Sequence, residues 1–379
     1  MEMLDITPVN WTSPDSIIKV IGVGGGGCNA VNYMYRQNIE GCTFIVCNTD
    51  AQALNKCDVP IKIQLGEGLG AGTNPTEGRN AALNSQDEIA EKVLDDKTEM
   101  LFITAGMGGG TGTGAAPIIA EAAKSAGILT VAVVTKPFAF EGPQRMRNAE
   151  EGIKNLAERV DSIVTIPNDL LLKIADKKVT INDSFKLADD ILRQGIQGII
   201  DIITQKGIVN CDFADVRTIM KDSGVAHMGI GIGKGENAAQ DAVRAAIESP
   251  LLETSIAGAE NVLLNITGGT EFSLVDMGEV SSIIKDMVSD EATIIVGSAM
   301  DETMKDEIKV TLIATSLDGS IKRNADAGVA AKKSTSTYSS ERRQPSYSSS
   351  VSDYDDDSIF KRRLRPGMSE IDVPGFFKR

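Results

Sequence analysis

The chain has 379 residues, which is long enough for two domains with separate hydrophobic cores. Its formal net charge of −15 argues against nucleic acid or a bare anionic membrane surface as a direct partner. No apolar run approaches the roughly 20 residues of a membrane-spanning helix, and the first residues lack the basic and apolar segments of a signal peptide. The sequence therefore predicts a cytoplasmic protein without direct membrane insertion.

The cysteines and the histidine do not indicate a metal centre. The five cysteines form no C-x-x-C pair, which is typical of reduced thiols in a cytosol. The only histidine, His227, has no cysteine or histidine near it in the sequence. We therefore expect neither a zinc site nor a Ser-His-Asp triad, and we assign no metal-ligating residue.

The first half of the chain alternates between strand patterns and helix patterns. Residues 1–16 are predicted to be a flexible leader, and 17–181 to form an α/β domain. Strands are expected at 17–23, 43–47, 101–104, 129–134 and 162–166. This alternation predicts a mostly parallel sheet with helices on both faces. Ligands of such sheets bind outside the carboxyl ends of the strands.

The second half begins with a long helical pattern. Apolar residues recur at helical spacing from Asn182 to Gln205, which predicts a central core helix at 182–206. A second α+β domain is expected at 207–317. Its strands are predicted near 225–232, 261–267, 292–296 and 309–315, and its helices near 238–248 and 273–286.

The composition changes after residue 317. Serine-rich polar segments predict a disordered linker at 318–367. The last segment, 368–379, ends in IDVPGFFKR, and its two phenylalanines favour a short peptide that docks on a partner. A frayed terminus is the alternative interpretation.

The run GMGGGTGTG at 106–114 lies between a strand pattern and a helix pattern expected to begin at Ala115. Glycines let backbone N–H groups converge on an anion, and the amino end of the next helix adds positive potential. Thr111 and Thr113 add hydroxyl groups. The run therefore predicts a phosphate-binding loop, although it lacks the Lys-Ser/Thr of the P-loop.

A second glycine loop, GGGGCN at 24–29, follows the first predicted strand, and a helix is expected from Ala30. Taken alone, Gly22, Gly24 and Gly27 fit G-x-G-x-x-G, with Asp50 as the ribose ligand of a dinucleotide-binding oxidoreductase. That alternative leaves the loop near residue 110 unexplained. Two phosphate-binding loops on neighbouring strands favour one triphosphate held from both sides.

GGGTGTG at 108–114 is the tubulin-type signature, and NTDAQAL, GLGAGTNPTEGR, PFAFEGPQRMRNAEEG and NCDFADVRTIM occur in the family order. Residues 17–317 resemble the FtsZ family of bacterial, tubulin-like cell-division GTPases. The resemblance implies an α/β, tubulin/FtsZ-like fold. It has a Rossmann-like GTP-binding domain, a long central helix, a GTPase-activating domain, and a disordered linker and tail.

The resemblance also implies GTP or GDP as cofactor, with Mg²⁺ held mainly by the phosphates. The loop at 68–75 would contact the γ-phosphate, Glu141 the ribose and Arg145 the phosphates. Asn168 and either Asp189 or Asp190 would recognise guanine, because a carboxylate accepts from both N1–H and N2–H₂. The implied nucleotide-binding residues are Gly24, Gly25, Gly26, Gly27, Cys28, Asn29, Ala71, Gly72, Thr73, Gly108, Gly109, Gly110, Thr111, Gly112, Thr113, Gly114, Glu141, Arg145, Asn168, Asp189 and Asp190.

Each of these assignments has a plainer alternative. The loop at 68–75 could be an ordinary turn. Glu141 and Arg145 could form an i,i+4 pair on a helix surface, and Asp189 and Asp190 could both face solvent.

Asn210, Asp212 and Asp215 are the candidate catalytic residues, with helix capping as the alternative role. They follow the long central helix, which spans roughly 30 Å or more. They would therefore reach a neighbour's nucleotide in a head-to-tail filament rather than their own.

The function implied is a GTP-dependent polymerising GTPase that assembles the cytokinetic Z ring on the inner face of the membrane. The tail from Ile371 to Arg379 would bind a membrane-tethering adaptor and division regulators. Two alternatives remain: a polymer that binds nucleotide with negligible hydrolysis, and the oxidoreductase.

Overall fold

The computed structural model describes residues 17–95, 97–174, 180–204, 211–252, 256–269, 272–301 and 303–316. All of them lie in one compact unit, residues 1–323. The predicted leader, linker and tail lie outside the described residues, and so does Asn210.

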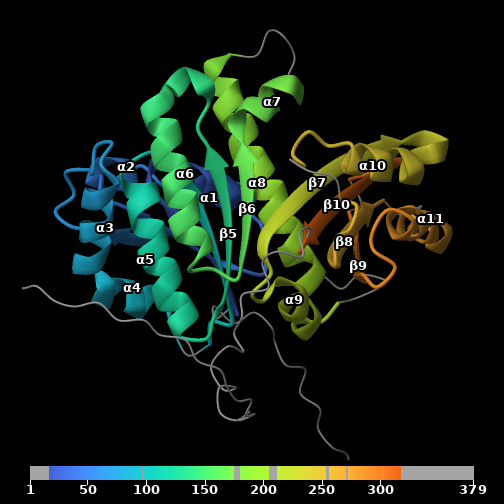
Figure 1. The fold of residues 1–379 in the computed structure, drawn as a ribbon, viewed down its shortest axis with the longest axis horizontal. Helices are drawn as coiled ribbons and strands as arrows, with labels where there is room; N and C mark the ends of the chain where they lie inside the picture. The colour runs from blue at the N-terminus through green and yellow to red at the C-terminus, as the bar shows by residue number, and fades with distance from the viewer. Residues whose placement is uncertain are drawn as a thin grey trace, which may run out of the picture. The chain divides into compact units, whose positions relative to one another are not determined.

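Within the described residues one ten-stranded sheet runs through both halves of the chain, in the order β3-β2-β1-β4-β5-β6-β7-β10-β8-β9 (Figure 1). β6 pairs in parallel with β7 through Ser162 and Gly224, which joins the two halves. The strands are β1 (Ile18–Val23), β2 (Thr43–Asn48), β3 (Ile61–Gln64), β4 (Met100–Gly106), β5 (Leu129–Lys136), β6 (Ser162–Pro167), β7 (Gly224–Lys234), β8 (Asn261–Gly268), β9 (Thr293–Met300) and β10 (Glu307–Thr315).

The strand directions differ between the halves. β1 to β6 pair only in parallel, as the βα alternation predicts. β10 is antiparallel to both β7 and β8. All nine predicted strands are present, although β9 continues four residues beyond its predicted end. β3 was not predicted, because only Ile63 of its four residues is fully buried and the apolar signal is weak.

Helices cover both faces of the sheet. In β1, Ile18 and Val20 face one hydrophobic cluster with α1 and α8, and Ile21 and Val23 face another with α3 to α6. The helices are α1 (Gly24–Arg36), α2 (Ala51–Asn55), α3 (Pro75–Asn84), α4 (Gln86–Val93), α5 (Thr111–Ser125), α6 (Pro143–Ala157), α7 (Asn168–Ile174), α8 (Ile181–Thr204), α9 (Phe213–Met220), α10 (Ala238–Ile247) and α11 (Leu274–Lys285).

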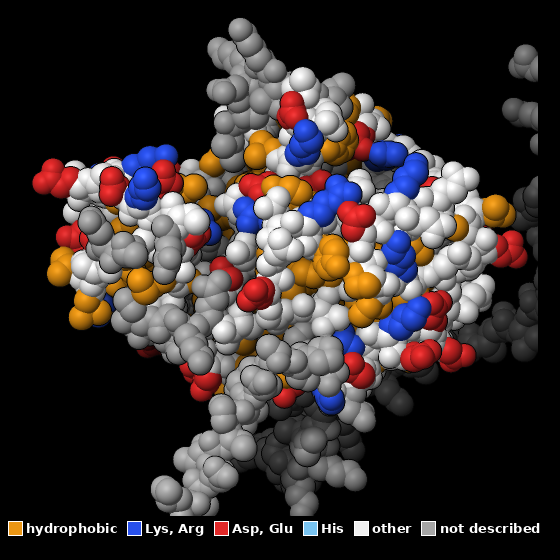
Figure 2. Space-filling view, turned by 180° about the vertical axis from the view of Figure 1, so that it is seen from behind, with side chains coloured by type: hydrophobic (Ala, Val, Ile, Leu, Met, Phe, Trp, Pro, Cys, Tyr) orange, Lys and Arg blue, Asp and Glu red, His pale blue; other side chains and the backbone are white. Residues whose placement is uncertain are grey.

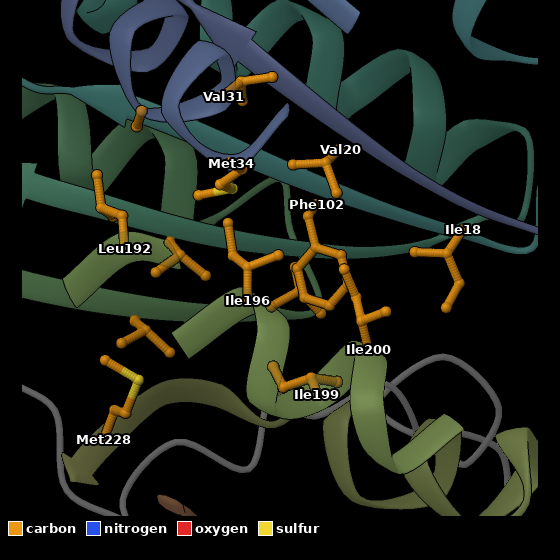
Figure 3. Packing of buried hydrophobic residues seen from close by; sticks show 14 of the residues in the cluster. Ile18, Val20, Val31, Met34, Phe102, Leu192, Ile196, Ile199, Ile200 and Met228 are labelled. Carbon is orange, nitrogen blue, oxygen red and sulfur yellow. The ribbon is translucent and has the colours of Figure 1, made fainter. Parts of the chain in front are cut away.

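The central helix is a core element, as its apolar pattern predicts. Ile196 and Ile200 of α8 pack against Phe102 of β4, and all three are completely buried (Figure 3). On the side of the second half, Asn265 Nδ2 in β8 donates to the carbonyl oxygen of Gly198 at 3.1 Å. α8 therefore holds the two halves of the sheet together from one face.

Charged side chains are mixed on the surface. On the face shown in Figure 2, Lys and Arg side chains lie among Asp and Glu side chains. The negative charge is therefore not concentrated in a single acidic region of that face. Within the parts of the chain that the structure describes, no helix is both long and apolar enough to span a membrane.

Candidate nucleotide-binding site

The two glycine loops meet at the carboxyl ends of neighbouring strands. Val23, the last residue of β1, pairs with Ala105 of β4, and α1 and α5 begin shortly beyond them. The amino ends of both helices therefore point into one cavity of about 330 Å³. Twelve of the predicted nucleotide-binding residues line this cavity: Gly25, Gly26, Asn29, Gly72, Gly109, Gly110, Thr111, Gly112, Glu141, Arg145, Asn168 and Asp189.

Chemistry rather than size identifies this cavity. A hollow of about 410 Å³ between α3, α5 and α6 is larger. The smaller cavity combines two helix amino ends, small residues with accessible amides, and two carboxyl side chains. These are the features that recognise phosphates and a polar base.

Both helices begin earlier than the sequence predicts. α1 begins at Gly24 rather than Ala30, and α5 begins at Thr111 rather than Ala115. Glycine has low helix propensity, but here the backbones approach too closely for any side chain. A Cβ on Gly27 would lie 2.3 Å from the Thr104 carbonyl oxygen, and one on Gly114 would lie 2.0 Å from that of Pro75. Residues 24–27 and 111–114 are therefore the first turns of helices, and packing explains the glycines at positions 27 and 114.

Other glycines of the same loops border open space. A Cβ on Gly25 or Gly109 would meet no atom within 4 Å, and both residues line the cavity. The loops therefore contain two kinds of glycine. Gly27 and Gly114 allow the backbones to pack, whereas Gly25 and Gly109 leave the cavity empty for a ligand.

The remaining predicted loop residues support the cavity from behind. Thr113 Oγ1 accepts from the Gly108 amide at 2.8 Å, so this hydroxyl holds the loop in shape. The Cys28 thiol is buried and donates to the carbonyl oxygen of Cys47 at 3.3 Å. The predicted nucleotide-binding residues that do not line the cavity are Gly24, Gly27, Cys28, Ala71, Thr73, Gly108, Thr113, Gly114 and Asp190.

The loop before α3 packs directly against the second glycine loop. The Gly110 amide donates to the Gly72 carbonyl oxygen at 3.2 Å. Asp50 has a different role from a ribose ligand. It caps α2 by accepting from the amides of Gln52 and Ala53, and it does not line the cavity. The dinucleotide alternative therefore lacks its acidic ribose ligand.

For Glu141 and Arg145 the geometry is compatible with both alternatives that the sequence left open. They form an i,i+4 ion pair across the start of α6, and both line the cavity. Glu141 Oε1 also accepts from the Phe138 amide at 2.9 Å, which fixes its position. The pair can therefore offer a carboxylate to hydroxyl groups and a guanidinium to phosphate oxygens.

The part of the cavity wall formed by α7 and α8 has two polar groups and an aromatic ring. Asn168 is only 4% exposed, and its Oδ1 has no hydrogen-bond partner among the described residues. Burial raises the pKa of the Asp189 carboxyl to about 7. Phe185 also lines the cavity, one turn before Asp189. Phe185 fits the apolar repeat of α8, so the sequence predicts a packing residue there, and its place in the cavity follows only from the fold.

Asp190 is engaged elsewhere, which separates it from Asp189. One of its oxygens forms an ion pair with Arg193 Nε at 2.8 Å and accepts from Tyr33 Oη at 3.3 Å. The other accepts from Gln194 Nε2 at 2.7 Å. Of the two neighbouring carboxylates, only Asp189 faces the cavity.

The candidate catalytic acids lie away from the cavity. Asp212 caps α9 by accepting from the Asp215 amide at 2.9 Å, so the capping role is present. Cavity residues of α8 lie between Phe185 and Leu192, whereas the acids follow its far end. The 24 residues of α8 span about 36 Å, and α7 and α9 lie at its opposite ends (Figure 1).

Comparison with known proteins identifies the family. The model of the Tubulin/FtsZ family GTPase domain matches residues 17–176, and that of the FtsZ family C-terminal domain matches residues 224–318. The cell division protein FtsZ of Coxiella burnetii is 51% identical over 312 residues, which is 81% of this chain and 80% of the relative. FtsZ of Pseudomonas putida is 53% identical over 327 residues, 85% of this chain and 80% of the relative.

A solved structure gives the same result. The empty FtsZ dimer of M. jannaschii superposes with a TM-score of 0.77 at 39% identity, covering 81% of this chain and 90% of that one. Both halves of the chain and their shared sheet therefore have counterparts in known structures. This chain belongs to the tubulin/FtsZ family of GTPases, and within it to the FtsZ cell-division proteins.

Proposed function

We propose that this chain binds GTP in the cavity between α1 and α5, polymerises head to tail, and hydrolyses GTP between subunits to build and renew the bacterial division ring. The observation that carries the proposal is the convergence of two helix amino ends on one cavity that Asp189 also lines. This arrangement suits a ligand with several phosphates and a base that donates hydrogen bonds.

The amino ends of α1 and α5 hold the phosphates. Amides next to Gly25 and Gly109 have open space before them, so phosphate oxygens can approach the backbone. Arg145 adds a cation at the rim once its pairing with Glu141 loosens. In phosphoryl-transfer enzymes such contacts chiefly position the phosphates and neutralise their charge.

Guanine specificity comes from Asp189 and Asn168. An ionised Asp189 accepts from N1–H and N2–H₂ of guanine, and adenine offers no matching pair of donors. The unpartnered Asn168 Oδ1 gives a further acceptor, and Phe185 provides an aromatic face for the base. Asp190, held in its ion pair with Arg193, takes no part in this choice.

Mg²⁺ fits this cavity only as a phosphate-bound ion. Among the described residues, no group of three His, Cys, Asp or Glu side chains is placed to hold a metal. The cavity offers the carboxylates of Glu141 and Asp189, and the first is already paired. Mg²⁺ keeps several waters and binds substrate phosphates readily. When bound, it neutralises charge on the phosphate oxygens.

The second subunit supplies Asp212, Asp215 and Asn210. Their carboxylate and amide groups orient the attacking water at the γ-phosphate of the neighbour below. Such a heterologous interface repeats into a filament. Residues 17–181 and 207–317 are then the nucleotide-binding and activating domains, connected by the helix at 182–206.

The tail from Ile371 to Arg379 tethers filaments to the membrane through an adaptor, so the protein acts in the cytoplasm at the division site. Deleting 371–379 should abolish adaptor binding and leave GTPase activity unchanged. Loss of GTPase activity in this variant would place the tail in the folded body and contradict the assignment.

The direct test of nucleotide choice compares Kd for GTP and ATP in competition with a fluorescent GTP analogue. Wild type should prefer GTP by about a hundredfold or more, since a site left with unpaired buried polar groups rejects the wrong ligand strongly. Asp189→Asn should lose most of this preference and Asp190→Asn should retain it. Equal Kd values for the two nucleotides in wild type would contradict the proposal.

A further inference from the structure

Thr49 lies just after β2, behind the cavity and outside its lining. It is 4% exposed, and its Oγ1 lies 2.6 Å from Oγ1 of Thr111, the first residue of α5. The distance is that of a good hydroxyl–hydroxyl hydrogen bond. Thr49 therefore contacts the phosphate-binding end of α5 without itself facing the cavity.

The main chain around Thr49 holds the other loop. Its carbonyl oxygen accepts from the Gly70 amide at 2.8 Å, and the next residue, Asp50, forms an antiparallel bridge with Leu69. The Ala51 amide donates to the Gly68 carbonyl oxygen at 3.0 Å. Residues 49–51 thus form the anchor from which the loop at 70–74 extends.

That loop returns to the glycine run. The Gly72 carbonyl oxygen accepts from the Gly110 amide at 3.2 Å, one residue before Thr111. These contacts therefore close a ring. The Thr49 side chain is hydrogen-bonded to Thr111, and the preceding residue, Gly110, is hydrogen-bonded to Gly72. Two residues before Gly72, the Gly70 amide returns to the Thr49 carbonyl oxygen. The glycine run and the loop at 70–74 are therefore joined twice, directly between Gly110 and Gly72 and indirectly through Thr49.

The direction of the hydroxyl bond responds to the ligand. A threonine hydroxyl has one proton to donate. When a phosphate oxygen accepts a hydrogen bond from the Thr111 hydroxyl, Thr49 must donate its own hydrogen bond to Thr111 Oγ1, because the Thr111 hydroxyl has no second proton to donate. The chain Thr49–Thr111–phosphate is then polarised in one direction, which strengthens each bond in it.

We propose that Thr49 is a positioning residue that couples phosphate binding at Thr111 to the placement of the loop at 70–74, and that it thereby sets the preference for GTP over GDP. The inference deepens the proposed GTP-binding function and depends on it. A γ-phosphate is contacted by both loops at once, whereas the phosphates of GDP are contacted only by the glycine run.

The test is Kd for GTP and for GDP with Mg²⁺, measured below the assembly threshold by displacement of a fluorescent nucleotide. Thr49→Val removes the hydroxyl at nearly constant shape, and Thr49→Ser restores it. Thr130→Val is the matched control, since Thr130 is a completely buried threonine whose hydroxyl donates to Ile128 away from the cavity. Thr49→Ala repeats the test if the valine variant does not fold.

We expect Thr49→Val to weaken GTP binding by about tenfold, which is at the upper end for the loss of one hydrogen bond between neutral groups. GDP binding should change much less, and Thr49→Ser and Thr130→Val should match wild type. Equal weakening of both nucleotides, or no change in either, would overturn the inference. Failure of wild type to bind GTP would instead contradict the proposed function.

Discussion

Arg217 of α9 donates a hydrogen bond from Nη2 to the carbonyl oxygen of Gly127, at 3.2 Å. Gly127 follows the carboxyl end of α5, whereas the glycine run lies at the amino end of that helix. The 15 residues of α5 span about 22 Å. Asp212 and Asp215, at the start of α9, are thus placed at the opposite side of the domain from the cavity of their own chain.

This separation predicts that Asp215→Ala binds GTP normally but does not hydrolyse it. Asp241→Ala is a suitable control, because Asp241 is likewise an exposed acid, on α10. Binding is measured below the assembly threshold, and hydrolysis by phosphate release above it. Loss of GTP binding in Asp215→Ala would contradict action on a neighbour.

Mixing two inactive variants tests the same point from the other side. Asp215→Ala retains the nucleotide cavity, and Gly110→Val retains the acids but has no room for a side chain, since a Cβ there lies 2.7 Å from the Gly72 carbonyl oxygen. A mixture should hydrolyse GTP faster than either variant alone. A mixture no more active than the sum of its parts would argue against a shared site.

The titration of Asp189 predicts that GTP binding depends on pH. Burial raises the pKa of its carboxyl to about 7, whereas guanine donors favour the ionised form. GTP binding below pH 7 must therefore release a proton from Asp189. The affinity for GTP should fall by about tenfold for each unit by which the pH is lowered below 7. Calorimetry in two buffers of different ionisation enthalpy measures the protons released.

The terminal phosphate of GTP also titrates, at about pH 6. The informative quantity is therefore the difference in the number of protons released between wild type and Asp189→Asn. Asp183→Asn, at an exposed position of the same helix, is the control. The same proton release in wild type and Asp189→Asn would show that Asp189 does not meet the base.

The two kinds of glycine predict opposite effects of alanine. Gly25→Ala should stabilise the free protein by about 0.5–1 kcal/mol through helix propensity, and should weaken GTP binding because its methyl group enters the cavity. Gly27→Ala should lower the free energy of unfolding by roughly 1–3 kcal/mol, because its Cβ meets the Thr104 carbonyl oxygen. Thermal melts with and without GTP separate the cases. A fold weakened by Gly25→Ala would be inconsistent with this division.

The core role of α8 predicts a large stability loss at Phe102. Phe102 is completely buried against Ile196 and Ile200 (Figure 3). Phe102→Ala should lower the free energy of unfolding by about 3–5 kcal/mol. Leu274→Ala, at a side chain 74% exposed, should change it by less than about 0.5 kcal/mol. Chemical denaturation measures both, and similar losses in the two variants would refute the core assignment.

Much of this architecture could be predicted because it depends on local pattern. Continuous apolar runs such as those of β1 and β4, and the helical repeat of α8, reflect which side chains must be buried. The starts of α1 and α5 could not be predicted, because glycine propensity favours a loop. Only the contacts of Gly27 and Gly114 with other segments explain a helix there.

The site shows the same limit. Asp189 and Asp190 are adjacent acids on one helix, and only the position of Arg193 and Tyr33 determines which of them is occupied elsewhere. Thr49 lies within the NTDAQAL motif, but its hydrogen bond to a partner 62 residues away in the sequence could not be predicted from that motif. Properties that depend on long-range neighbours need the fold.

The most direct measurement of the central claim is GTPase activity per molecule against protein concentration, with Mg²⁺. A site completed by a second subunit predicts activity near zero when the protein is dilute and a rise above a threshold concentration. Activity per molecule that stays constant with dilution would show a self-contained GTPase. It would leave Asp212 and Asp215 as helix-capping residues only.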